Sequence, residues 1–125
     1  MWPLRRETLQ RTISVTIGST GNEPVERESI DLPLQFNLYP NRPNPFNPGT
    51  RISFDIPRDT YADLSVFDVL GKKVVTLFSG EIDARSHEYY WDGLDAAGNN
   101  VPSGLYFYIL SSRDYYAGRK MLLIR

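Results

Sequence analysis

Short stretches with the pattern of a β-strand recur along this chain of 125 residues and constrain its fold more than any other feature. In residues 51–56, Ile52, Phe54 and Ile56 alternate with polar residues, as in a strand with one buried face. Similar stretches, separated by turn-forming residues, follow about every ten to twelve residues: 62–68, 73–78, 86–91, 104–110 and 116–124. The sequence therefore predicts an all-β, Ig-like or fibronectin-like antiparallel β-sandwich of about seven strands.

Two local features refine this prediction. Residues 104–110 are apolar or aromatic after the initial glycine, which predicts a central strand covered on both faces. Between 62–68 and 73–78, Gly71 can adopt the positive φ that a tight turn needs, and Asp68 can accept hydrogen bonds from turn amides.

The amino-terminal part reads differently. Residues 11–17 alternate like a strand, whereas 18–29 are polar and contain glycine, as in a linker. We therefore expect residues 1–30 to be the tail of a preceding region plus a linker, and 31–125 to be the domain. No apolar segment resembles a signal peptide or a membrane span, so an export signal is expected elsewhere in a longer protein.

Composition excludes several classes of protein. The formal net charge of −1 offers no basic field for nucleic acid. The chain has no cysteine, which excludes disulfides, thiolate metal sites and a cysteine nucleophile.

Candidate catalytic groups are few. His87 is the one histidine, and it lies in a predicted strand without an evident triad partner or second metal ligand. Glu81, Asp83 and Glu88 lie near predicted strand edges, with no apolar pocket to shift their pKa values. We therefore expect no enzyme activity.

The loop after residue 91 has two interpretations. Asp92, Asp95, Asn99 and Asn100 offer oxygen ligands for calcium, but their spacing is not that of an EF-hand. The favoured interpretation is a turn in which Asp and Asn bond to nearby amides and glycines supply unusual φ angles, so no cofactor is predicted.

The loop at 40–50 contains four prolines: Pro40, Pro43, Pro45 and Pro48. It either presents a polyproline ligand or forms a stiff entry into the first core strand, with Phe46 plugging one end of the sandwich; the second interpretation is favoured. Five aromatics raise a further alternative, a carbohydrate platform, although at strand spacing they are more often core residues: Tyr89, Tyr90, Trp91, Tyr106 and Tyr108.

Residues 36–54, 64–74, 91–108 and 119–125 carry a resemblance to a known family. In this order they resemble the motifs of the carboxyl-terminal type A sorting domain of the type IX secretion system, over roughly residues 31–125. The 91–108 motif is also similar to that of the Ig-like domain of the flagellar hook-capping protein. The extra residues 41–43 depart from the family pattern. The motif positions singled out are Asn44, Pro45, Phe46, Asn47, Pro48, Asp68, Gly71, Trp91, Asp92, Gly93, Gly98, Gly104 and Tyr106.

The resemblance implies a recognition tag. Such a domain directs an upstream cargo from the periplasm of a Bacteroidota-type bacterium through the outer-membrane translocon, to the medium or the cell surface. The expected partners are this translocon and the fused cargo, with neither nucleic acid nor membrane insertion. The alternatives are an adhesion or carbohydrate-binding module and a structural assembly domain.

We place the recognition surface at the last strand, which offers an edge for β-augmentation, together with the loop 113–116. The residues concerned are Arg119, Lys120, Met121, Leu122, Leu123, Ile124 and Arg125.

Overall fold

The computed structural model describes residues 10–17 and 25–125 of the chain. All regular secondary structure in these ranges is β-strand. No segment within these ranges forms an apolar helix of membrane-spanning length. The strands are β1 (Gln10–Ile17), β2 (Val25–Pro33), β3 (Asn37–Leu38), β4 (Thr50–Ile56), β5 (Thr60–Phe67), β6 (Lys73–Ile82), β7 (Arg85–Trp91), β8 (Gly104–Ser112) and β9 (Tyr116–Leu123).

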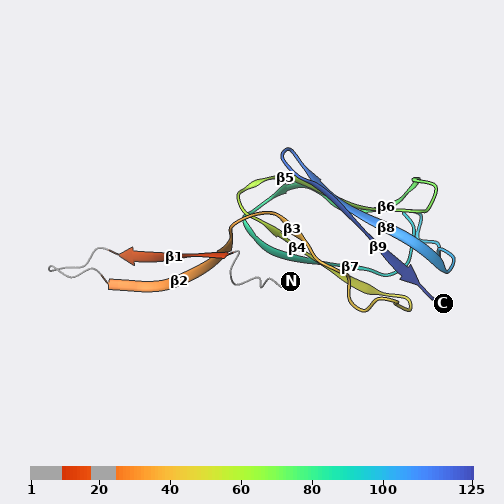
Figure 1. The fold of residues 1–125 in the computed structure, drawn as a ribbon, viewed down its shortest axis with the longest axis horizontal. Helices are drawn as coiled ribbons and strands as arrows, with labels where there is room; N and C mark the ends of the chain where they lie inside the picture. The colour runs from red at the N-terminus through yellow and green to blue at the C-terminus, as the bar shows by residue number, and fades with distance from the viewer. Residues whose placement is uncertain (1–9, 18–24) are drawn as a thin grey trace.

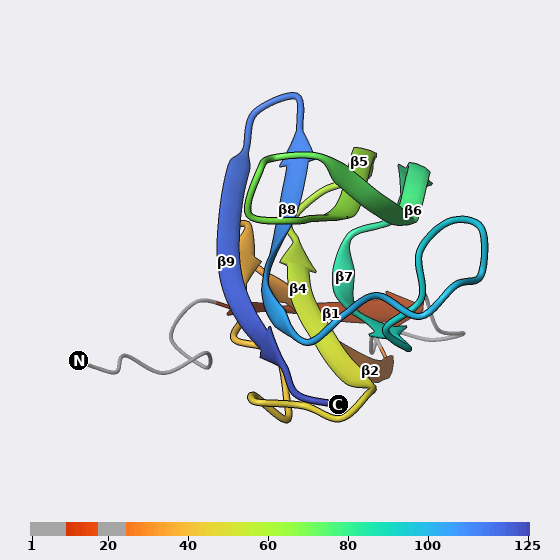
Figure 2. The ribbon, with the colours of Figure 1, turned by 90° about the vertical axis from the view of Figure 1, so that its right-hand side faces the viewer.

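Strands β3 to β9 form two antiparallel sheets packed face to face (Figure 1). One sheet has the order β3-β4-β7, and the other has the order β6-β5-β8-β9. Figure 2 looks at the sandwich from the end where the C-terminus lies. The predicted all-β, Ig-like sandwich of about seven strands is confirmed.

The core lies between the sheets because apolar side chains alternate along the strands that face each other. Ile52, Phe54 and Ile56 of β4 are fully buried, as the alternation predicts. The other core residues come from both sheets and from two loops: Leu38, Phe46, Ala62, Leu64, Val66, Ile82, Trp91, Val101, Tyr106, Tyr108, Leu110, Met121 and Leu123.

The prediction that residues 104–110 are covered on both faces is wrong. β8 is central in the hydrogen-bonded sheet, between β5 and β9, but only one of its faces meets the other sheet. Tyr106, Tyr108 and Leu110 are buried, whereas Leu105 on the opposite face is 38% exposed. A two-layer sandwich has no third layer to cover this outer face.

The amino-terminal part forms a separate hairpin in which β1 and β2 pair antiparallel (Figure 1). The predicted strand at 11–17 is β1. Residues 25–29, expected in a linker, instead belong to β2, and the expected linker residues 18–24 lie outside the described ranges. The polar sequence of β2 shows no apolar alternation, so the strand was not predicted. It forms because pairing with β1 supplies its backbone hydrogen bonds. A domain boundary near residue 30 stays a prediction.

Two side chains connect the four-stranded sheet to the segment around β3. The Tyr108 hydroxyl donates to the carbonyl oxygen of Tyr39 at 2.7 Å, and the Arg119 Nε donates to that of Leu38 at 2.7 Å. These bonds fix the position of the sheets relative to each other at the edge where β9 lies.

Tyr108 makes the domain sensitive to high pH. Burial raises the pKa of its hydroxyl to about 12. Unfolded tyrosine loses its proton near pH 10, so its stabilising contribution is present below about pH 10 and is lost as the pH rises towards 12. We expect the urea midpoint to fall across this window, and to fall less steeply in Tyr108→Phe. Equal slopes for the two proteins would contradict this assignment.

Candidate recognition surface

β9 is an edge strand of the four-stranded sheet and contains most of the residues predicted for recognition. Its side chains alternate between core and solvent. Met121 and Leu123 are 1% and 0% exposed, whereas Lys120 and Leu122 are exposed, as is Ile124 just after the strand. Two of the seven predicted recognition residues, Met121 and Leu123, therefore hold the strand in place, and the other five are exposed.

The carboxyl-terminal half of the β9 edge already has a partner in the proline-rich loop. The Phe46 amide donates to the Leu122 carbonyl at 3.0 Å, and the Ile124 amide donates to the Phe46 carbonyl at 2.9 Å. The Leu122 amide donates to the Asn44 Oδ1 at 3.0 Å. An added strand therefore cannot pair with residues 122–124, and the expected β-augmentation is confined to the edge at 116–120.

Arg125 is anchored by both backbone and side chain to the loop that precedes β8. Its amide donates to the Ser103 Oγ at 2.8 Å, and its guanidinium donates to the carbonyls of Val101 and Gly93 at 2.5 and 2.7 Å. A Cβ at Gly93 would lie 2.9 Å from the Arg125 Nη2 and 3.1 Å from the Pro48 carbonyl, and its φ is 82°. Glycine thus lets the loop and the end of the chain approach each other.

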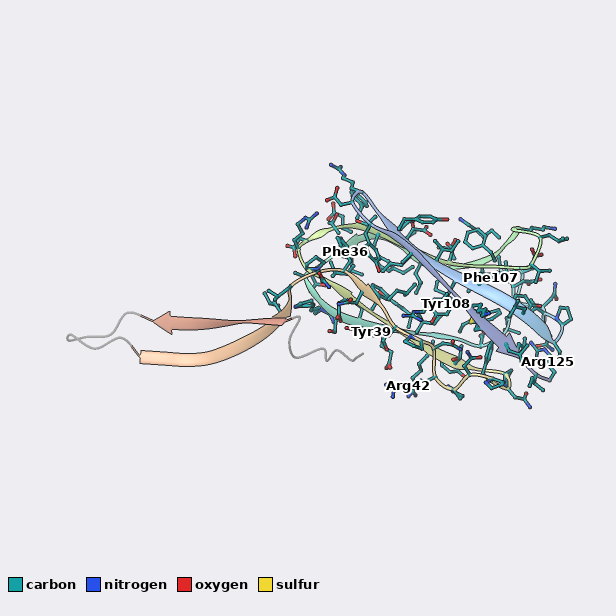
Figure 3. All side chains as sticks on the ribbon, in the orientation of Figure 1. Phe36, Tyr39, Arg42, Phe107, Tyr108 and Arg125 are labelled. Atoms are coloured by element: carbon teal, nitrogen blue, oxygen red, sulfur yellow. The ribbon has the colours of Figure 1, made fainter. Side chains whose placement is uncertain are left out.

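The predicted recognition surface combined two regions that the fold separates. Of residues 113–116, the first three form the turn between β8 and β9 and Tyr116 begins β9; in this turn Tyr115 stacks on Phe36 at 4.8 Å. Arg125 lies beyond the other end of β9. Figure 3 shows Phe36 and Arg125 at opposite ends of the sandwich. The turn and the end of the chain therefore do not form one surface.

Three of the motif aromatics meet at the end of the sandwich near the C-terminus. Phe46 is 2% exposed and lies 5.7 Å from the Trp91 ring, and the Tyr106 ring lies 5.5 Å from Trp91. The Trp91 Nε1 donates to the Leu94 carbonyl, and the Tyr106 hydroxyl donates to the Pro102 carbonyl. Phe46 thus plugs this end, as predicted.

The other motif positions shape loops. Asp68 Oδ1 accepts hydrogen bonds from the amides of Leu70 and Lys72 at 2.9 Å, and Gly71 has a φ of 82°, as the turn prediction requires. Gly104 begins β8. The remaining positions are exposed in loops: Pro45, Asn47, Pro48, Asp92 and Gly98.

In the loop after residue 91, the carboxylates considered as calcium ligands already accept hydrogen bonds from backbone amides. Asp92 Oδ1 accepts a bond from the Leu94 amide, and Asp95 Oδ1 accepts bonds from the amides of Ala97 and Asn99. Within residues 10–17 and 25–125, no three His, Asp or Glu side chains gather as metal ligands. The carboxylates therefore act as the turn interpretation predicts.

His87 belongs to the core rather than to a reactive site. It is 8% exposed, stacks on Phe54 at 5.4 Å, and has its Nε2 2.9 Å from the Asp83 carbonyl oxygen. Glu81, Asp83 and Glu88 are exposed on the surface.

The aromatics considered as a carbohydrate platform do not share a surface. Trp91, Tyr106 and Tyr108 are buried, and Tyr89 packs against Phe78 at 5.5 Å. Tyr90 is the exposed member of this set, at 59%.

This geometry defines a small Ig-like β-sandwich domain. The family model of the FlgD Ig-like domain matches residues 42–114, more than half of the chain. The chain therefore belongs to the FlgD Ig-like domain family, which is not a catalytic family.

Solved structures show related folds. Dimeric latent PorU from Porphyromonas gingivalis matches with 16% identity and a TM-score of 0.57, over 92% of this chain and 12% of that chain. PorZ, a surface component of the type IX secretion system of the same organism, matches with 22% identity, a TM-score of 0.48 and coverages of 70% and 11%. FlgD from P. aeruginosa matches with 25% identity, a TM-score of 0.47 and coverages of 60% and 60%. This chain thus spans less than two thirds of each. Curated proteins gave no match.

Proposed function

We propose that residues 31–125 are a sorting domain that directs an upstream cargo through the type IX outer-membrane translocon. The order of the sequence motifs supports this role, and membership of the FlgD Ig-like family and the fold shared with PorU are consistent with it. On this proposal residues 1–30, which include β1 and most of β2, are the end of the cargo and its connection to the domain. The protein passes through the periplasm and is then secreted or attached to the cell surface.

The observation that carries the proposal is an exposed row at the end of β9. Lys120, Leu122 and Ile124 face solvent, and Leu105 lies beside Leu122 in the register of β8 and β9. The three apolar residues are 38%, 38% and 48% exposed. Grouped exposed apolar side chains mark protein interaction sites. The charge of Lys120 beside them would fix the orientation of a partner that carries the opposite charge.

The test is a secretion assay with the whole 125-residue chain behind a periplasm-directed reporter. The host has a working type IX system, and a translocon-deficient strain is the comparison. We expect translocon-dependent reporter in the medium or on the surface, and loss of that export in Leu122→Ser/Ile124→Ser.

The matched control is Leu34→Ser/Tyr61→Ser, which removes two comparably exposed apolar side chains (46% and 55%) away from β9. It should be exported normally. Folded wild-type reporter retained in the periplasm of both strains would reject the sorting role and favour adhesion or assembly. Normal export of Leu122→Ser/Ile124→Ser would show that the exposed row on β9 is not the recognition surface, while the sorting role of the domain would stand.

A further inference from the structure

Two arginines stand directly opposite each other on the outer side of the three-stranded sheet. The amide of each donates to the carbonyl of the other, at 3.0 Å from Arg42 and 2.8 Å from Arg51. Opposite residues of an antiparallel pair carry their side chains on the same face, with Cα atoms about 5.5 Å apart. Both residues are exposed, and Figure 3 shows the Arg42 side chain pointing away from the core.

Among the described residues neither arginine forms an ion pair, although the Glu88 carboxylate lines the same concavity. The ion pairs there join Arg58 to Asp114, and Asp83 to Arg85 and His87. Like charges directly opposite in a sheet are destabilising. A bound anion would relieve that repulsion, and two guanidinium groups match the planar oxygens of a carboxylate or the oxygens of a sulfate.

The backbone that carries Arg42 is held rigidly by a buried network. Asn41, 2% exposed, donates through Nδ2 to the Thr50 Oγ1 at 3.0 Å and to the Pro43 carbonyl at 3.2 Å. The Thr50 hydroxyl donates to the same carbonyl at 2.9 Å. These contacts hold the residues that depart from the sorting-domain pattern, so the backbone that carries the two arginines is preorganised.

Groups suited to a sugar surround the pair. Glu88 and Ser53 line a shallow concavity of about 490 Å³ with the arginines, and the Ser53 hydroxyl donates to Glu88 Oε2 at 3.4 Å. Tyr90 pairs in register with Arg51 and is 59% exposed. Its ring lies over Gly49, where a Cβ would come within 1.6 Å of the hydroxyl.

We propose that this face binds an acidic saccharide, in which a uronate or sulfate group lies between Arg42 and Arg51. The Glu88 carboxylate accepts hydrogen bonds from sugar hydroxyls, the Ser53 hydroxyl can donate or accept them, and Tyr90 stacks on the apolar face of a ring. The carboxylate of Glu88 limits the net charge of the site, which favours a singly charged group with hydroxyls over a densely anionic polymer. The site does not involve the exposed row on β9.

The test titrates the whole chain in a calorimeter with oligogalacturonate, which carries one carboxylate per sugar. A densely sulfated heparin tetrasaccharide is the comparison and should bind no more tightly. We expect saturable binding that salt weakens, because the contacts are exposed. Arg42→Gln/Arg51→Gln should weaken binding at least about tenfold. Tyr90→Ala should weaken saccharide binding without changing the response to inorganic sulfate. The charge-matched control is Lys72→Gln/Arg113→Gln, which should bind as the wild type does.

A thermal shift provides a second readout that does not depend on the calorimeter. The saccharide should raise the Tm of the wild type and leave that of the double arginine variant unchanged. Absence of binding, equal binding of neutral dextran, or equal losses in the charge-matched control would overturn the proposal. Binding of polyglutamate as tight as that of the saccharides, and insensitive to Tyr90→Ala, would assign the site to an acidic peptide instead.

Discussion

A chain that ends at Lys120 is expected to lose its cooperative unfolding transition, and not merely a recognition signal. The deletion removes Met121 and Leu123, which are 1% and 0% exposed, and with them the backbone bonds to Phe46 and the anchors of Arg125. Losing one such buried side chain costs about 2–5 kcal/mol, against a total stability of about 5–15 kcal/mol for a domain. Thermal unfolding followed by circular dichroism measures the outcome.

The exposed-row variant Leu122→Ser/Ile124→Ser is the counterpart that keeps the strand. Both side chains face solvent, so its free energy of unfolding should stay within about 1 kcal/mol of the wild type. A truncated chain that unfolds at the wild-type midpoint would contradict the prediction. Until that is measured, failed export of a truncated chain does not identify a recognition signal, because an unfolded domain fails for other reasons.

Trp91→Ala is expected to lower the free energy of unfolding by about 3–5 kcal/mol. Trp91 is 1% exposed, contacts the rings of Phe46 and Tyr106, and donates to the Leu94 carbonyl at 2.9 Å. The substitution leaves a large cavity and an unpaired carbonyl where two loops meet, between β3 and β4 and between β7 and β8. Denaturant titration measures the loss, and Tyr61→Ala at an exposed site is the control. A loss below about 1 kcal/mol would show that the plug at this end contributes little.

Phe46→Ala tests whether Phe46 and Trp91 stabilise this end of the sandwich jointly. Phe46 and Trp91 are in contact, so the effects of the two substitutions should not add, with a coupling of about 0.5–3 kcal/mol in a double-mutant cycle. Additive losses would mean that the two rings stabilise the domain independently.

Alternation in sequence was enough to predict which residues face the core. Ile52, Phe54 and Ile56 are buried because a strand directs successive side chains to opposite faces, whatever its partners are. The same local argument failed for β8. Its apolar outer residues, such as Leu105, suggested cover on both faces, but cover depends on how many layers the domain has.

The turn residues were equally predictable, because Asp68 and Gly71 act within a few residues of their own positions. The short β3 and the polar β2 carry weak local signals and form through pairing with β4 and β1. Their existence therefore depended on the strands with which they pair rather than on their own residues.

The all-β class, the inward faces of the main strands and the chemistry of the turns could be predicted from the residues alone, since they follow from backbone periodicity and local hydrogen bonding. Three features required the folded sandwich: Phe46 covers the edge of β9, Arg125 is bonded to Gly93, and Arg42 lies opposite Arg51. These features arise where segments far apart in the chain approach one another. No local pattern specifies which strand edge a loop will occupy, because that choice is made by the packing of the whole sandwich.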